Sequence, residues 1–140
     1  MTREEIILVA DFLGCRIIQN DYGKIFIGHI DMFDHKEMGI TKKELKTNFN
    51  AGWHDAWFTH EDVVDFDTDY RELMSIVEEI TNNGYEFNIA YDKVTITGVT
   101  TFIEGFGDTL IDKIYNCCLE FIKSHHSVSN KNKKLLKQIA

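Results

Sequence analysis

Residues 67–97 read DTDYRELMSIVEEITNNGYEFNIAYDKVTIT and hold the clearest pattern in the chain. Apolar side chains recur at helical spacing over residues 70–80, and Asn82-Asn83-Gly84 supplies the left-handed residue with which many helices end. Beyond that point apolar and polar side chains alternate over residues 85–97, with a short link at Asp92. Alternation with a period of two is typical of strands. The stretch therefore predicts a helix followed by an antiparallel hairpin.

The N-terminal part of the chain predicts the same two kinds of element. Thr2 and Glu5 have the spacing of a capping box, which indicates a helix that begins at Thr2. Residues 15–19 and 24–30 read as strands, and the intervening residues 20–23 have strong turn chemistry. A second hairpin is therefore expected near the N-terminus.

The remaining elements complete an α+β pattern. Residues 100–103 suggest a further strand, and residues 108–124 carry the apolar stripe of a helix. The spacing of Thr41 and Glu44 suggests a short helix over residues 41–49, within a middle region formed by residues 31–66. We expect a mainly antiparallel sheet of two hairpins, with four to six strands, covered on one face by three to four helices.

Length and composition indicate one folded domain. The chain has 140 residues, of which 44% are hydrophobic, and 17 are aromatic, which is enough for a single core. We expect residues 1–127 to form this domain and residues 128–140 to be a flexible basic tail. Three cysteines without framework spacing, and no long apolar run near the N-terminus, predict a cytoplasmic protein without a membrane segment.

Charge narrows the class of partner. The net charge is −8, and four lysines lie in the last eleven residues, where there is no acidic residue. Residues 1–129 therefore carry 11 basic and 23 acidic side chains, a net charge of −12. Such a body repels phosphate backbones, which disfavours nucleic-acid binding and favours a basic protein partner.

One segment combines aromatic and polar side chains in the way of a binding surface. Both tryptophans and two of the six histidines lie within residues 48–65. Tryptophan is enriched at binding hot spots, although it is also an ordinary core residue. The predicted binding residues are Trp53, His54, Asp55, Trp57, Phe58 and His60.

A metal site is the alternative interpretation of the same region. His29 and Asp31 would share one face of a strand, and His54 and His60 could complete a ligand set. The spacing matches no established metal motif. Catalytic residues are not predicted either, because Ser75 lacks a nucleophile-elbow context and Cys117-Cys118 lies on an apolar helix face. We therefore predict no cofactor, and keep the four residues as metal candidates.

Three blocks of the sequence resemble a group of small uncharacterised phage and prophage proteins, notably of Bacteroidetes. The stretch from Asp67 to Ile80, followed by Gly84-Tyr85, looks like their Leu-Met-x-Val-Val-Glu-Lys-Ile…Gly-Tyr core. Residues 114–123 resemble their closing helix, and residues 9–14 their opening one. The resemblance implies a shared fold and a phage or mobile-element origin, which would place the protein in a host cytoplasm. It implies no catalytic residues.

Together these observations predict a non-enzymatic accessory binding protein that captures a host protein or a small ligand. The competing hypothesis is a metal-dependent hydrolase that uses His29, Asp31, His54 and His60. A third is a homo-oligomer, in which a hairpin edge pairs with a second copy.

Overall fold

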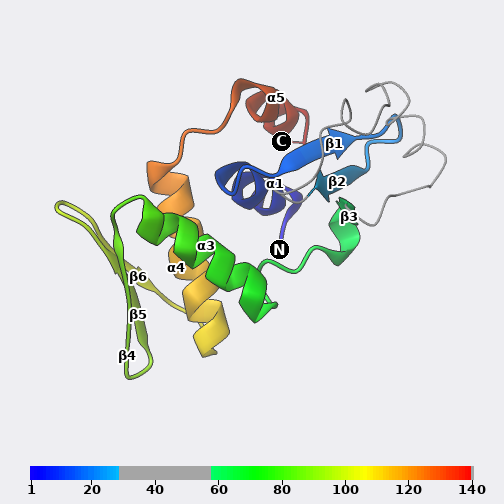
Figure 1. Ribbon diagram of the computed structural model, residues 1–140. Helices are drawn as coiled ribbons and strands as arrows, with labels where there is room; N and C mark the ends of the chain where they lie inside the picture. The colour runs from blue at the N-terminus through cyan, green and yellow to red at the C-terminus, as the bar shows by residue number, and fades with distance from the viewer. Residues whose placement is uncertain (29–57, 140) are drawn as a thin grey trace. The chain divides into compact units, whose positions relative to one another are not determined.

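Four α-helices and six β-strands occur in residues 1–28 and 58–139, the part of the chain that the computed structural model describes (Figure 1). In chain order they are α1 (Arg3–Phe12), β1 (Arg16–Gln19), β2 (Ile25–Gly28), β3 (Phe58–His60), the 3-10 turn η1 (Glu61–Val63), α3 (Tyr70–Asn82), β4 (Glu86–Ala90), β5 (Lys93–Thr97), β6 (Phe102–Gly105), α4 (Leu110–His125) and α5 (Asn130–Ile139). Backbone contacts group them into unit 1, Met1–Leu13 with Asp65–Ala140, and unit 2, Gly14–Val64.

The helix and hairpin predicted within residues 67–97 are both present. Helix α3 begins where the Asp69 carboxylate accepts the backbone N–H groups of Arg71 and Glu72, at 2.8 and 3.3 Å. The chain leaves the helix through Gly84, whose φ of 91° is a conformation that costs glycine little. Strands β4 and β5 then pair antiparallel from Glu86 opposite Thr97 to Ala90 opposite Lys93.

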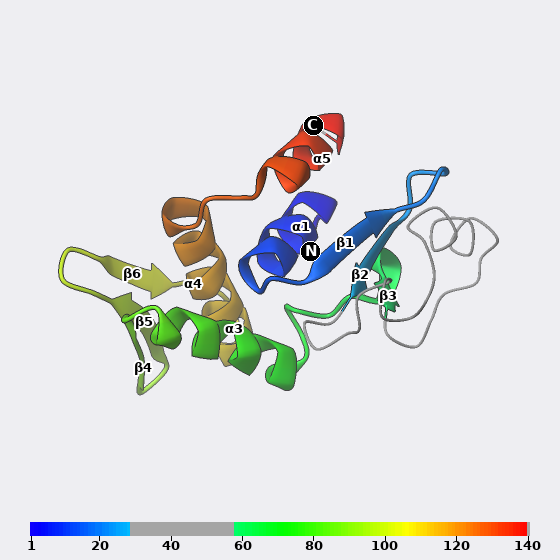
Figure 2. The same ribbon diagram turned by 45° about the horizontal axis from the view of Figure 1, so that its top comes forward.

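The sheet of unit 1 has the order β4-β5-β6, and all its pairs are antiparallel. Alternate residues of one strand lie on the same side of the sheet, as do residues that face each other across neighbouring strands. Val94 and Ile96 are therefore on one side, where both are fully buried. Helices α3 and α4 lie on one side of this sheet in both views (Figures 1 and 2). Their apolar faces and this side of the sheet form the core of unit 1.

Helix α4 packs unusually close to β6. A Cβ atom at Gly105 would collide with the carbonyl oxygen of Lys113 and lie 2.7 Å from Cβ of Cys117. Only glycine fits there without moving the helix away from the strand. Helix α4 begins with a capping box formed by Thr109 and Asp112, which fixes its start beside this contact.

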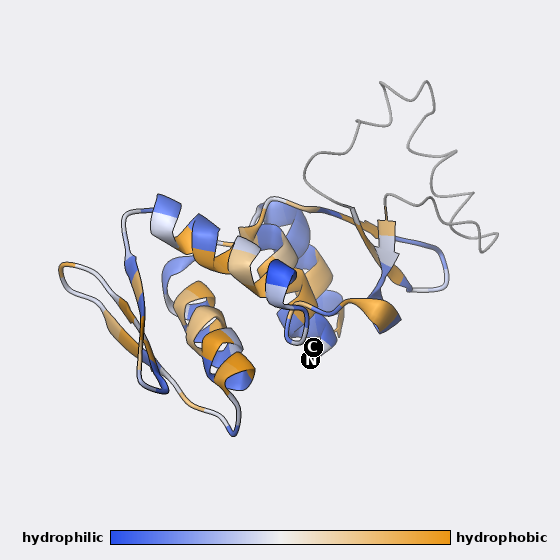
Figure 3. Ribbon diagram, turned by 60° about the horizontal axis from the view of Figure 1, so that its bottom comes forward, coloured by the Kyte–Doolittle hydropathy of each residue, from blue (hydrophilic) through white to orange (hydrophobic). Residues whose placement is uncertain are grey.

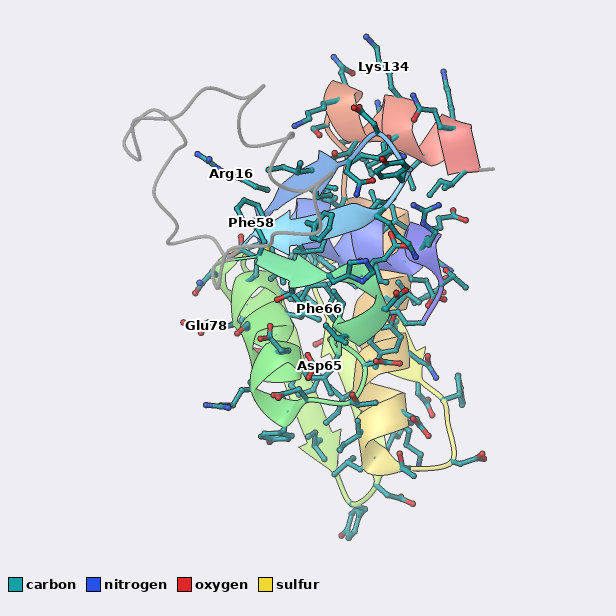
Figure 4. The ribbon with its side chains drawn as sticks, turned by 90° about the vertical axis from the view of Figure 1, so that its right-hand side faces the viewer. Arg16, Phe58, Asp65, Phe66, Glu78 and Lys134 are labelled. Carbon is teal, nitrogen blue, oxygen red and sulfur yellow. The ribbon has the colours of Figure 1, made fainter. Side chains whose placement is uncertain are left out.

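Helix α5 lies within residues 128–140, the stretch expected to be a basic tail. The sequence there is rich in lysine, and Lys134 projects from the helix in Figure 4. Leu135, Leu136 and Ile139 are nevertheless only partly exposed, and the helix contacts α1. The lysines and the apolar side chains follow a helical period, so the segment is amphipathic rather than uniformly solvated.

Unit 2 contains the predicted N-terminal hairpin. β1 and β2 pair antiparallel from Arg16 opposite Gly28 to Gln19 opposite Ile25, and β3 adds to the other edge of β2. The Asn20 side chain shapes the turn by accepting the backbone N–H groups of Tyr22 and Lys24, at 3.0 and 2.9 Å.

The α+β class, the antiparallel hairpins and the number of elements confirm the fold predicted from sequence. The two hairpins belong to separate three-stranded sheets, each with its own third strand. That residues 1–127 form a single domain stays a prediction. The helix predicted over residues 41–49 lies outside the described residues.

Replacing Gly105 by alanine should destabilise the protein by about 3 kcal/mol, because the added methyl group meets helix backbone rather than a flexible side chain. Chemical denaturation measures the loss. Gly84→Ala is the matched control: it has a left-handed φ but no atom within 4 Å of the new Cβ, so it should cost only about 1 kcal/mol. Equal losses would contradict the close packing of α4 on β6.

Candidate binding surface

Exposed apolar side chains concentrate around the sheet of unit 1. Among the described residues, ten large hydrophobic side chains are exposed, and six of them fall within residues 89–110. These six are Ile89, Tyr91, Val99, Phe102, Phe106 and Leu110. Single exposed apolar residues are ordinary, but a concentration of them on one part of a fold marks an interaction surface.

The side of the sheet that faces away from α3 and α4 is largely polar. Thr95 lies between Asn88 of β4 and Glu104 of β6, and Thr97 lies opposite Phe102. Lys93 forms a 3.4 Å ion pair with Glu104 across this side. Phe102 is therefore an exposed aromatic ring in a polar setting. We call this side and the two turns that join its strands the outer sheet surface.

The turn between β4 and β5 holds the most unusual residue of this surface. Tyr91 is fully exposed and has a φ of 60°. It is the only residue other than glycine with a positive φ in residues 1–28 and 58–139. A bulky residue is a true outlier in this conformation, which costs about 1–2 kcal/mol. The turn therefore combines a strained backbone with a fully exposed tyrosine ring.

A side chain of helix α4 holds this turn in place. The Lys113 ammonium group donates a 3.0 Å hydrogen bond to the backbone carbonyl of Asp92 and lies 3.5 Å from its carboxylate. The Lys113 side chain is mostly buried, whereas the Asp92 carboxylate is exposed. The contact to the carbonyl fixes the backbone next to Tyr91 and so limits the conformations that could relieve its strain.

The turn between β5 and β6 is held in a similar way at the other end of α4. Gly98 and Thr101 exchange backbone hydrogen bonds around Val99, which is fully exposed, and part of this turn is hydrophobic in Figure 3. The Thr101 hydroxyl lies 3.1 Å from Nε2 of His125. The His125 ring stacks on Phe121 with a centroid distance of 4.8 Å, which holds it in place. Both exposed turns are therefore attached to α4.

The paired cysteines of α4 are packed in the core of unit 1, as the sequence predicted. Cys117 and Cys118 are buried. Burial, assisted by the negative charge of Glu104, raises the pKa of Cys117 to about 11 even though backbone hydrogen bonds partly oppose it. Burial also raises the pKa of Cys118 well above its usual range. Both side chains stay thiols near neutral pH and are poor nucleophiles.

A polar cluster centred on Asp11 joins α1 to the start of α5. The Asp11 carboxylate accepts hydrogen bonds from the Ser129 hydroxyl at 2.8 Å and the Asn132 amide at 2.6 Å, and lies 2.6 Å from Nε2 of His126. It also accepts the Ser129 backbone N–H. Its side chain is only 7% exposed. Asp11 thus caps the N-terminus of α5 from α1, where a negative charge is also favoured by the helix dipole.

This cluster contains serine, histidine and aspartate but has the geometry of a clamp. In a catalytic triad histidine lies between the other two and takes the serine proton. Here aspartate is central, and both Ser129 and His126 bond to it. The serine hydroxyl donates its proton to the carboxylate, so the arrangement anchors a helix and does not activate a nucleophile.

A hollow of about 450 Å³ lies between the start of α1 and the end of α5. Thr2, Arg3, Glu4, Leu136 and Ile139 line it. The Thr2 hydroxyl and the Glu5 carboxylate are already used in the capping box of α1. The hollow is partly open to solvent, unlike the deep sites that bury most of a small molecule.

The sequence-predicted site residues fall mostly outside the described part of the chain. Trp53, His54, Asp55 and Trp57, with the metal candidates His29 and Asp31, are not described. Phe58 is 5% exposed in β3, so its ring points into the fold (Figure 4). His60 packs edge-on against Phe26 at 5.1 Å, and its Nδ1 accepts the backbone N–H of Asp62 at 3.1 Å. In residues 1–28 and 58–139, no three His, Cys, Asp or Glu side chains are grouped to hold a metal ion.

The sequence pattern does not reveal the outer sheet surface, because Tyr91 looks like a further residue of strand β4. Tyr91 continues the alternation of Phe87 and Ile89, so the pattern extends the strand to it. The type of residue at position 91 does not indicate that its φ is positive. The one available signal was Asp92, a turn-forming residue beside an aromatic one.

Comparisons with known proteins do not extend this picture. No family model matches the chain, and neither a curated protein nor a solved structure matches it. Within the described residues, no helix is both long enough and apolar enough to span a membrane.

Acid should release α5 before the rest of unit 1 unfolds. Although burial alone would raise the pKa of Asp11, hydrogen bonds from Asn132, His126 and Ser129 lower it below its ordinary value of 3.8. The stabilisation from this carboxylate is therefore complete above about pH 4 and is lost as the pH falls through the lowered pKa. Hydrogen exchange of the α5 amides, followed from pH 6 towards pH 3 and corrected for intrinsic rates, measures the release.

Asp11→Ala should produce the same release of α5 at neutral pH. It should lower the free energy of unfolding by about 1–3 kcal/mol, because the groups that donate hydrogen bonds to Asp11 lose their acceptor. Glu78→Ala is the control, because Glu78 is an exposed acid that points away from α3 (Figure 4). Protection of α5 that is equal in both variants would show that Asp11 does not hold the helix.

Proposed function

We propose that the chain is a non-enzymatic protein-binding protein that engages its partner through the outer sheet surface of unit 1. The observation that carries the proposal is Tyr91, a fully exposed ring at a left-handed backbone position. Backbone strain of this kind persists where the surrounding structure enforces it, and it clusters at functional sites. Glycine or asparagine would form the turn with less strain, so the tyrosine side chain is what the strain serves to present.

The bracing of both turns supports a binding role. Lys113 holds the Tyr91 turn, and His125 meets Thr101 beside Val99. A surface that is already ordered loses little conformational freedom on binding, and this raises affinity without additional contacts. Tyrosine is also among the residues most enriched at hot spots.

The shape of the surface favours a macromolecular partner over a small ligand. Small-molecule sites are concave and bury most of their ligand. Tyr91 and Val99 instead project from turns, and Phe102 lies on an open strand face. Projecting side chains need a partner that supplies the pocket, which is what a folded protein does.

The acidic body and the sequence resemblance indicate the setting. A net charge of −8 favours a basic protein over nucleic acid. The resemblance to phage and prophage proteins suggests an accessory protein of a phage or mobile element, which would meet such a partner in the host cytoplasm. The partner is thus a host protein with a basic surface.

Tyr91→Gly should weaken partner capture strongly and leave the fold intact. Glycine relieves a strain of about 1 kcal/mol but gains freedom in the unfolded chain, so the free energy of unfolding should change by less than about 1 kcal/mol. Loss of a hot-spot ring costs about 2 kcal/mol of binding, or about thirty-fold in Kd. Affinity capture from host lysate with quantitative mass spectrometry identifies the partner, and calorimetry with the purified partner measures Kd.

The control is Tyr22→Ala, which removes another exposed tyrosine, on the turn between β1 and β2 in unit 2. It should bind the purified partner as tightly as the unchanged chain. Binding that is equal for all three proteins would exclude Tyr91 from the interface and contradict the proposal.

A further inference from the structure

Strand β4 lies at the edge of its sheet and is exposed along nearly its whole length. In the described part of the chain, its single hydrogen-bonded neighbour is β5. Four of its five residues are exposed, and Phe87 is partly exposed. The other edge strand, β6, is less exposed, with one exposed residue among its four. The more exposed edge strand of this sheet is therefore β4.

The register identifies which backbone groups of β4 point outward. Tyr91 and Asp92 form a two-residue turn, and such a turn closes on a pair that exchanges hydrogen bonds, here Ala90 and Lys93. Along an antiparallel ladder these pairs alternate with pairs that do not exchange bonds. Asn88 and Glu86 therefore bond to β5, and the N–H and C=O groups of Phe87 and Ile89 point away from the sheet.

This edge carries little of the usual protection against strand addition, because Glu86 at its start is the only charged side chain of β4. Native edges are blunted by proline, lysine, bulges or very short strands. The chain has no proline, β4 has no lysine, and its pairing with β5 is continuous over five residues. Ile89, which shares the helix-covered side with Val94, is still 43% exposed. An added strand could cover it and supply partners for the outward backbone groups.

The surroundings of this edge are negatively charged. Helix α3, which packs on β4, has three acidic residues and one basic residue. Glu86 adds a further acidic side chain at the start of β4. Asp92 follows at the other end, beyond Tyr91, where the Lys113 ammonium group 3.5 Å away offsets part of its charge. A cationic strand is favoured here, because opposite charges steer association and like charges oppose it.

We propose that an extended, basic segment of the partner protein adds to β4 as a fourth strand. Its backbone bonds to Phe87 and Ile89, its alternate apolar side chains cover Ile89, and its basic side chains meet the acidic residues of α3 and β4. Strand addition is a recurring way in which proteins bind peptides, with affinity from the main chain and selectivity from side chains. The inference rests on the proposed function, since it names the partner segment that runs past Tyr91.

Amide hydrogen exchange of β4, measured by NMR, tests the geometry with three synthetic peptides. The first alternates lysine and valine, the second alternates glutamate and valine, and the third has the composition of the first in two blocks. At about ten times its dissociation constant the first peptide should slow exchange at Phe87 and Ile89 by about tenfold. Glu86 and Asn88, already bonded to β5, should change little. The other two peptides should bind at least about tenfold more weakly.

Two variants separate the backbone from the side chain. Ile89→Pro removes the outward N–H but no bond to β5 and should abolish peptide binding, because proline is tolerated on an edge where its nitrogen faces solvent. Ile89→Thr keeps the N–H and should retain binding. Unchanged binding by Ile89→Pro, uniform protection along β4, or equal binding of the acidic peptide would each overturn the proposal.

The remaining outcomes distinguish this inference from the proposed function. Partner capture that is lost in Tyr91→Gly but kept in Ile89→Pro would leave the proposed function standing and overturn strand addition. Protection of Phe87 and Ile89 that rises with protein concentration, without peptide, would assign the edge to a second copy of the chain and overturn the basic segment. Alternating protection by the basic peptide, with no role for Tyr91, would support the edge site and remove the proposed function.

Discussion

The close approach of α4 to β6 is the constraint on which the rest of unit 1 depends. Gly105 leaves no space for a side chain between the strand and the helix. The helix therefore lies near enough to the sheet for Lys113 to reach one turn and His125 the other. Because the same helix buries its apolar face on the sheet, any displacement of it would expose the core and release both turns together.

The bracing explains how the strain at Tyr91 is tolerated. A left-handed tyrosine could relax if the turn were free to change its backbone conformation. The hydrogen bond from Lys113 to the Asp92 carbonyl opposes that change. The packing of α4 thus offsets the free-energy cost of the strained backbone at Tyr91. The Tyr91 ring is thereby held in a fixed, exposed position. This division of labour is common where a rigid scaffold positions a loop that binds.

The sequence predicted those features that depend on near neighbours. The helix α3 and its hairpin follow from apolar spacing and from Gly84, and the capping box of α1 from Thr2 and Glu5. Docking of α5 could not be predicted in this way, because Asp11 lies 118 residues before Ser129, to which it binds. The role of Tyr91 could not be predicted for a different reason. Its residue type fits the alternation of a strand, whereas its positive φ depends on the turn type that the hairpin adopts.

Charge and edge geometry have to act together for selective binding. Backbone hydrogen bonds at an open edge are available to any extended chain, so β4 alone would discriminate poorly. The acidic side chains of α3 and β4 raise the cost for acidic segments, including those of other copies of this acidic protein. In the proposed complex Tyr91 would then distinguish among basic segments, because it would require a pocket or an apolar surface just beyond the paired residues. In the complex we propose, selectivity would therefore come from combining three weak requirements on one strand of the partner, none of which would suffice alone.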